Sequence, residues 1–168
     1  MKIEKNQAQA NGRDIGISTK QSIEICNFIK KKETSKAKSL LEGVIKLKTA
    51  VPYNRFKRDI PHRKGMASGR YPSKAAQEFL RLVNLAESNA KEKGLDSEKL
   101  FIRYAIANKG ASSRHAGRFR GLKRKRTHIS IILEEKQKRS EKKAEKPKGT
   151  EAKKIDLGKL KIKEKKND

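Results

Sequence analysis

The segment from Leu100 to Leu133 decides the fold, and it reads LFIRYAIANKGASSRHAGRFRGLKRKRTHISIIL. Its two ends, LFIRYAIA and THISIIL, are rich in β-branched and aromatic residues, and every second residue from Ile129 is apolar. Both features are typical of β-strands. Between Gly110 and His128 the segment holds seven Lys or Arg and no acidic residue. The segment therefore predicts one β-hairpin with apolar roots and a cationic distal half.

The distal half of this hairpin has little to hold it together in the free chain. An isolated two-stranded ribbon is marginally stable in water, and like charges at its tip repel one another. We therefore expect the tip, about residues 110–122, to be mobile alone and to become ordered when its cations neutralise phosphates. Its small residues permit close backbone approach, and its arginines suit pairing with phosphate or stacking on bases.

The composition indicates a polyanionic partner. The 168 residues include 45 Lys or Arg against 19 Asp or Glu, a net charge of +26, and 33% hydrophobic residues. This is enough for one modest domain with additional arms or tails. Nucleic acid is the expected partner, and an anionic membrane surface is the weaker alternative. The single cysteine and the lack of a long apolar run predict a cytoplasmic protein that does not enter a membrane.

Three amphipathic helices are predicted before the hairpin. The first covers about residues 18–32, where Ser18 and Gln21 have the spacing of a capping box. The second is expected to be capped by Thr34 and to run until near residue 51, because a proline follows. The third covers about residues 72–94 and ends at a glycine. Each helix carries an apolar stripe that predicts a face packed on the core.

A second basic stretch, PYNRFKRDIPHRKGMASGRYPSK at residues 52–74, connects two of these helices. It contains seven Lys or Arg, one Asp and three aromatic residues. Aromatic residues between cations suggest single-stranded or looped RNA, because rings stack on exposed bases. The alternative is a solvated loop whose aromatic residues cover the domain. The length and charge of the stretch exceed those of an ordinary connection.

No catalytic or metal-binding constellation is predicted. The three histidines have no carboxylate or cysteine at ligand spacing, so we expect no metal and no cofactor. Cys26 lies on the apolar stripe of the first helix and is interpreted as a small core residue. Gly65 and Gly69 are loop glycines without the Lys-Ser or Lys-Thr of a phosphate-binding loop. The sequence therefore predicts a protein that is not an enzyme.

Six motifs carry a resemblance to a known family. In order, AVPYNRF, HRKG, GRYPSKAAQEFLRLVNLAESNA, GLDSEKL, IANKG and RTHISIIL resemble the archaeal branch of the large-subunit ribosomal protein family numbered twenty-two, whose eukaryotic members are numbered seventeen. The resemblance covers about residues 12–135. It implies an α+β fold with three helices packed on a small three-stranded antiparallel sheet. It also implies a long protruding β-hairpin and a third strand within residues 7–17.

The same resemblance implies a structural constituent of the large ribosomal subunit in the cytoplasm. Its hairpin would bind large-subunit rRNA, aid assembly and line the nascent-peptide exit tunnel. Expected partners are that rRNA, neighbouring large-subunit proteins and the nascent polypeptide at the hairpin tip, with the protein monomeric within the ribosome. The segment after Gly110 is a few residues shorter than is typical of the family, and at the tip only Gly117 and Arg118 match its pattern.

The residues expected to bind RNA belong to the basic loop, to the hairpin or to their neighbours. They are Arg13, Lys20, Tyr53, Arg55, Lys57, Arg58, His62, Arg63, Lys64, Arg70, Tyr71, Lys74, Lys109, Arg114, His115, Arg118, Arg120, Lys123, Arg124, Lys125, Arg126 and His128. The resemblance further implies a tunnel-facing tip. Its residues are Ser112, Ser113, Arg114, His115, Ala116, Gly117, Arg118 and Phe119.

The predicted organisation is a single domain over residues 1–135, with a hairpin arm over about 100–133, and a basic extension over 136–168. The extension holds fourteen Lys or Arg and six acids, a composition typical of a disordered or helical tail. An anchor on an RNA surface and an unbound solvated tail both remain open for it. A basic DNA-binding architectural protein is the alternative function, although no heptad or dimer face supports it. An RNA-modifying enzyme would need a cofactor loop or a catalytic dyad.

Overall fold

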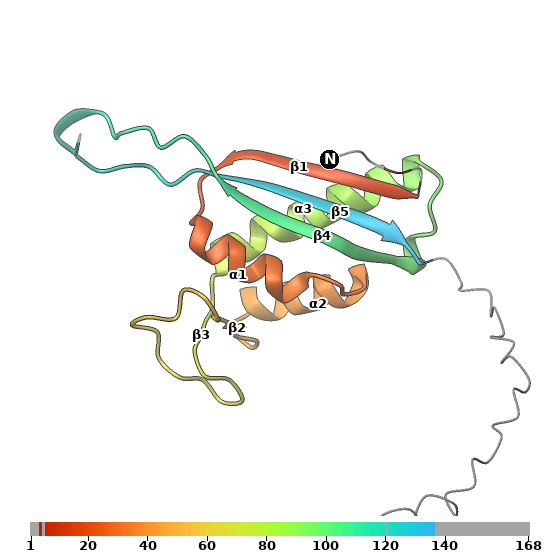
Figure 1. Ribbon diagram of the computed structural model, residues 1–168, viewed down its shortest axis with the longest axis horizontal. Helices are drawn as coiled ribbons and strands as arrows, with labels where there is room; N and C mark the ends of the chain where they lie inside the picture. Colours follow the sequence, from red (N-terminus) through yellow and green to blue (C-terminus); the bar gives the residue numbers. More distant parts are fainter. Residues whose placement is uncertain (1–3, 5, 120, 137–168) are drawn as a thin grey trace, which may run out of the picture. The chain divides into compact units, whose positions relative to one another are not determined.

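A computed structural model describes Glu4 and residues 6–119 and 121–136 of the chain. Apart from Lys136, the C-terminal extension predicted over 136–168 lies outside the described residues. Figure 1 shows the elements in chain order. They are β1 (Gln7–Ile15), α1 (Thr19–Ile29), α2 (Thr34–Ile45), β2 (Val51–Pro52), β3 (Gly69–Arg70), α3 (Ser73–Glu92), β4 (Leu100–Lys109) and β5 (Thr127–Glu135), with short 3-10 turns at Ser97–Lys99 and Gly117–Phe119.

The main sheet has three antiparallel strands in the order β1-β5-β4. The predicted alternation in β5 is confirmed, because Ile129, Ile131 and Leu133 are all buried. Ile131 pairs with Ala10 of β1 and Ala105 of β4. The sheet thus brings the N-terminal strand beside the last described strand, and β5 occupies the centre because both of its edges are hydrogen-bonded.

The three helices pack on one side of this sheet (Figure 1). Helix α3 packs against β1 and β5, α1 against β4, and α2 against α3. The largest buried side chains between these layers include Ile25, Leu41, Phe79 and Ile102, and they belong to one apolar cluster. The predicted α+β class with three helices and a three-stranded antiparallel sheet is therefore confirmed.

Helix α1 ends at Ile29, three residues earlier than predicted, because the chain turns to meet β4. Lys31 has a left-handed φ of 63°. Its N–H donates to Ile102 O at 2.8 Å, and the N–H of Ile102 donates back to Lys32 O at 2.8 Å. At the other end, Ser18 is the N-cap but its side chain makes no capping bond. The capping box predicted for Ser18 and Gln21 is therefore wrong.

Helix α2 begins at Thr34, with Glu33 as its N-cap in place of the predicted Thr34, and it ends at Ile45 and not near residue 51. Leu47 adopts a left-handed φ of 58°, and the N–H groups of Lys48 and Thr49 both donate to Gly43 O, at 2.8 and 3.1 Å. This turn closes the helix before the proline is reached. The residues after it form β2, which pairs with β3 at the two ends of the basic loop.

Strand β1 confirms the N-terminal strand that the resemblance implied within residues 7–17. Its inward residues are the small Ala8 and Ala10, both buried, so the strand shows little hydrophobic alternation. A Cβ on Gly12 would lie 2.5 Å from Ile15 Cδ1 and 3.0 Å from Leu82 Cδ1. Glycine therefore allows the close approach of the strand to α3, and a larger residue would displace the ends of these two side chains.

Candidate nucleic-acid interface

The start of the basic loop is held by a buried acid that sequence reasoning missed. Glu24 of α1 is 1% exposed. Its Oε1 accepts the N–H groups of Arg55 at 3.0 Å and Phe56 at 3.1 Å, and its Oε2 accepts that of Asn54 at 3.3 Å. The available signal was a lone acid between Ile23 and Ile25 on the first helix. Glu24 thus positions the backbone from which the loop cations extend.

The far end of the loop is held by β3 and by backbone hydrogen bonds. Tyr53 N donates to Ser68 O at 2.9 Å, and Gly69 N donates to Pro61 O at 3.3 Å. A Cβ on Gly69 would meet Met66 Sδ at 2.6 Å, so this glycine allows the loop to fold closely on itself. The ordered backbone leaves the predicted cations at the surface. Those exposed are Arg55, Lys57, Arg58, His62, Arg63, Lys64, Arg70 and Lys74.

Two of the three aromatic residues of the loop, Tyr53 and Phe56, cover the domain, which is the alternative that the sequence left open. Tyr53 is 5% exposed and belongs to the core, so its ring offers no free face for a base. Phe56 and Tyr71 are half-buried. Cations lie over both rings: Lys20 Nζ is 5.7 Å from the Phe56 centroid, and the Arg63 guanidinium carbon is 5.5 Å from that of Tyr71. Packing against the core therefore explains the presence of Tyr53 and Phe56 in a charged loop.

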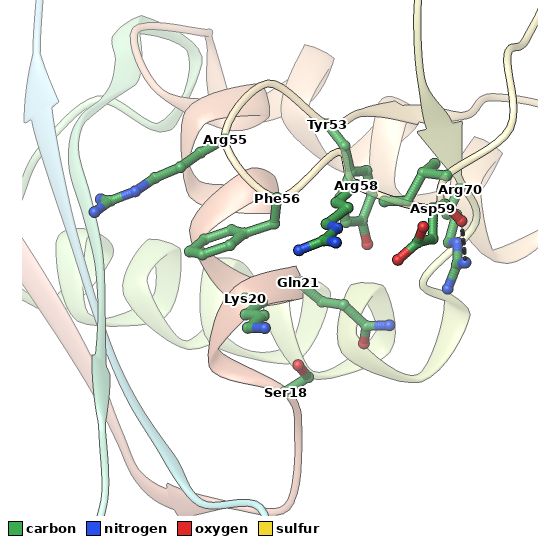
Figure 2. Close-up of a pocket in the computed structure, with 10 residues that line it drawn as sticks. Ser18, Lys20, Gln21, Tyr53, Arg55, Phe56, Arg58, Asp59 and Arg70 are labelled. Carbon is green, nitrogen blue, oxygen red and sulfur yellow. Dashed lines mark hydrogen bonds between the residues drawn. The ribbon is translucent and has the colours of Figure 1, made fainter.

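A pocket of about 410 Å³ lies between the loop and the first turn of α1. Figure 2 shows Arg58 extending from the loop toward that turn, while Arg55 points away from the other lining side chains. Arg70 Nη2 donates to Asp59 O at 3.3 Å. The residues that line the pocket are Ser18, Lys20, Gln21, Tyr53, Arg55, Phe56, Arg58, Asp59, Ile60 and Arg70.

Tyr53 lines this pocket, and its hydroxyl has no hydrogen-bond partner among the described residues. Among the described residues it is the one buried side-chain oxygen or nitrogen that lacks one. Burial raises the pKa of the Tyr53 phenol above its ordinary value; Arg70 opposes this shift and Glu24 adds to it. The phenol is therefore protonated at neutral pH, and its buried O–H donor lacks an acceptor among the described residues.

The root of the hairpin is joined to the start of α1. Thr127 is fully buried, and its Oγ1 lies 3.0 Å from Thr19 Oγ1 and donates to Ile17 O at 3.0 Å. Gly110 N donates to Arg126 O at 2.9 Å across the root. A second pocket, of about 430 Å³, opens here. It is lined by Ser18, Thr19, Lys20, Lys109, Ser112, Lys123, Arg124, Lys125 and Arg126.

Two predicted residues near the root are already engaged within the protein. Arg126 Nη1 donates to Asp14 O at 2.7 Å. His128 Nδ1 accepts the Asp14 N–H at 3.2 Å, and its Nε2 lies 3.9 Å from Asp14 Oδ1. Both side chains are half-buried. Arg13 beside them is exposed and lines a separate shallow pocket with His128.

Beyond Lys109 and Thr127 the regular ladder of β4 and β5 ends, and the connecting segment continues past the sheet (Figure 1). His115 N donates to Leu122 O at 3.0 Å and Arg124 N to Ser113 O at 2.8 Å. Residues 111–118 and 121–125 are all exposed. Arg120 and the side chain of Phe119 lie outside the described part of the chain.

The cations of the loop and of the tip have no acidic partners among the described residues. The ion pairs among the described residues lie in other parts of the fold. Examples are Lys38 with Glu87 between α2 and α3, and Arg103 with Glu134 on the sheet. The free cations thus form two surfaces, and Lys20 belongs to the pockets of both. Such surfaces attract a polyanion.

Other candidate chemistry is absent from the described residues. They contain no group of three or more His, Cys, Asp or Glu arranged to hold a metal ion. Cys26 is confirmed as a core residue, because it is buried and desolvation raises the pKa of its thiol to about 12. Among the described helices, none combines the length and the apolar character that crossing a membrane requires.

Most of the chain is similar to a known family. The family model described as Ribosomal protein L22p/L17e matches residues 10–134. Relatives named large ribosomal subunit protein uL22 include that of Methanoculleus marisnigri, 40% identical over 138 residues, which are 77% of this chain and 90% of the relative. That of Methanopyrus kandleri is 40% identical over 137 residues, 76% and 86% of the two chains. That of Methanococcoides burtonii is 48% identical over 104 residues, 61% and 69%.

Proposed function

Because this chain belongs to the ribosomal protein L22p/L17e family, we propose that it binds large-subunit rRNA as a non-catalytic, structural constituent of the large ribosomal subunit. The observation that carries the proposal is the pair of cationic surfaces, on the basic loop and on the hairpin tip, whose cations have no acidic partners among the described residues. Ion pairing within the protein would have cancelled this charge, and phosphate groups supply the missing counter-charge.

In the proposed mechanism, the folded domain docks on the RNA surface and the hairpin arm inserts between RNA segments. The helices and the sheet supply the core, whereas the segment past Lys109 and Thr127 contributes exposed residues and no described core residue. Placed between RNA segments, the arm neutralises phosphates and holds the segments together during assembly. Six to ten such contacts change affinity by roughly 10³ to 10⁵ between ~50 and ~200 mM salt.

The finer assignments rest on what the family resemblance implies. We assign the tip, Ser112 to Phe119, to the wall of the nascent-peptide exit tunnel, where it contacts the nascent polypeptide. Neighbouring large-subunit proteins are the other partners, and the protein is a monomer within the ribosome. Residues 1–135 act as the docking domain with its arm, and residues 136–168 as a basic extension. No cofactor or metal takes part.

The test compares RNA with DNA. Binding of the full chain to archaeal large-subunit rRNA and to duplex DNA is measured at matched salt, and sedimentation with large subunits is followed through a high-salt gradient containing magnesium. We expect tighter binding to rRNA and retention on the subunit. Tighter binding to duplex DNA would instead favour an architectural DNA-binding protein and overturn the proposal.

A further inference from the structure

We propose that the pocket between the basic loop and the first turn of α1, the loop pocket, is a binding site for an RNA backbone phosphate. We further propose that it continues across that turn into the pocket at the hairpin root, the root pocket, so that one RNA strand occupies both. This inference rests on the proposed rRNA binding and names the site that performs part of it.

The Tyr53 hydroxyl is the observation that indicates a ligand. Tyr53 is only 5% exposed, and its hydroxyl oxygen has no hydrogen-bond partner among the described residues. A buried donor without an acceptor destabilises the folded chain, so native proteins seldom keep one without a reason. A phosphate oxygen in the loop pocket accepts this hydrogen bond. The raised pKa keeps the donor proton in place at neutral pH.

The charges of the loop pocket select an anion. Four cations line it, Lys20, Arg55, Arg58 and Arg70, against the single carboxylate of Asp59. None of these five side chains forms an ion pair with another described residue. Arg58 and Lys20 approach the cavity from opposite sides, one from the loop and one from α1 (Figure 2). A phosphate accepts paired hydrogen bonds from a planar guanidinium and is attracted by the point charge of an ammonium group. An arginine beside a lysine is therefore suited to bind it.

Helix α1 contributes its N-terminus to both pockets. The helix has eleven residues, its N-cap Ser18 makes no side-chain capping bond, and its first turn carries no acid. The first N–H groups of a helix lack intrahelical partners and bear partial positive charge. Nothing within the helix satisfies or neutralises them here. An anion above this turn therefore gains backbone donors as well as side-chain charge.

The two pockets adjoin at the first turn of α1, because they share lining residues. Ser18 and Lys20 line both of them. The hydroxyl contacts of Thr127 with Thr19 and Ile17 attach the hairpin root to this turn, so the spacing between the pockets is set by the folded domain. An RNA strand that crosses the turn meets loop cations on one side and hairpin cations on the other.

The decisive variant is Tyr53→Phe, which removes one oxygen and leaves the packed ring. Binding to archaeal large-subunit rRNA is measured for the full chain over a range of salt. We expect affinity to fall about tenfold, the loss for a hydrogen bond to a charged group. The dependence on salt should be unchanged because no charge is lost, and the thermal midpoint of the free protein should be equal or higher. Unchanged affinity would overturn the proposal.

Charge variants test the path of the strand. Arg58→Gln and Lys20→Gln lie at exposed positions and should each reduce the slope of log K against log salt by about 0.7 to 0.9, the value for one phosphate. The matched control is Lys48→Gln, an exposed cation outside both pockets, which should leave the slope unchanged. If all three variants reduced the salt slope equally, the cations would attract RNA without a specific site, and the proposed site would be wrong.

The outcomes separate this inference from the proposed function. If the protein binds duplex DNA more tightly than rRNA, the proposed function is wrong. The proposed phosphate site is then wrong as well, because it rests on rRNA binding. A chain that prefers rRNA, loses affinity on removal of the hairpin tip, and is indifferent to Tyr53→Phe and Arg58→Gln retains the function and refutes the pocket alone. Should Tyr53→Phe fold poorly, Arg58→Gln decides the matter, because that side chain is outside the core.

Discussion

Glu24 shows at the scale of one residue how a chain with so many cations uses a buried acid. The carboxyl group forms no ion pair within the described residues, and it accepts three consecutive backbone N–H groups of the loop. Backbone donors offset the cost of burying a carboxyl group, and they leave the nearby cations free to face solvent. The acid therefore orders the loop without consuming its charge.

Replacing Glu24 by Gln should loosen the loop. The amide keeps one acceptor oxygen but turns an NH₂ group toward at least one of the three donors, so we expect a loss of about 1–3 kcal/mol in the free energy of unfolding. Urea denaturation measures the loss, and amide exchange at Asn54, Arg55 and Phe56 locates it. The control is Glu42→Gln, whose side chain is 54% exposed and whose effect should stay within about 0.5 kcal/mol. Equal losses in both variants would contradict a positioning role for Glu24.

The hairpin shows at the scale of an element where regular structure ends and why. Up to Lys109 and Thr127 each residue of β4 and β5 has a partner or lies at a bulge, and the helices cover one face. Beyond them the described residues up to Lys125 are exposed except Gly110. Gly110 closes the root because a Cβ there would lie 3.1 Å from Arg126 Cβ and 3.2 Å from its carbonyl carbon.

Gly110→Val should open the root. The added side chain meets the opposite strand, so we expect a loss of about 1–3 kcal/mol and faster exchange of the amide that donates to Arg126 O. Hydrogen exchange followed by NMR measures both. Gly121→Val provides the matched control, since a Cβ at Gly121 meets nothing within 4 Å. Slow exchange retained in Gly110→Val would show that the close approach at the root is not required.

At the scale of the whole molecule, core and charge are separated. The buried cluster draws on the helices and on the main sheet, whereas the free cations of both surfaces lie on the loop, on the hairpin and at the first turn of α1. Net charge near +26 destabilises a compact state through self-repulsion. Keeping the cations outside the core allows folding before a polyanion arrives.

Deletion of Ser112 to Gly121 tests this separation. The described residues of that segment are exposed and contribute nothing to the core, so the thermal midpoint should change by less than about 4 °C, the shift that corresponds to 1 kcal/mol. Incorporation into large subunits during reconstitution should slow. Phe79→Ala, which leaves a cavity in the core, serves as the contrast and should lower the free energy of unfolding by about 3–5 kcal/mol. If the deletion unfolded the domain, the division into core and arm would be wrong.

The local sequence pattern was sufficient to predict the elements in which apolar residues recur at a regular spacing. The alternation in β5 and the apolar stripe of α3 predicted both correctly, because side-chain periodicity is a direct consequence of strand and helix geometry. The family motifs implied β1, whose small inward alanines carry no such signal. The early ends of α1 and α2 were not predictable, since backbone bonds to β4 and a left-handed turn at Leu47 terminate them.

The sequence by itself determined the cationic character of the surface and the class of partner, because net charge and its clustering do not depend on how the chain folds. Tertiary structure alone decided which groups meet. It placed Tyr53 in the core and in the lining of the loop pocket, brought Glu24 to the loop backbone, and made Lys20 common to two pockets. These contacts are between residues that lie thirty to more than one hundred positions apart in the sequence. Contacts across such distances depend on how the elements pack, which no local sequence pattern encodes.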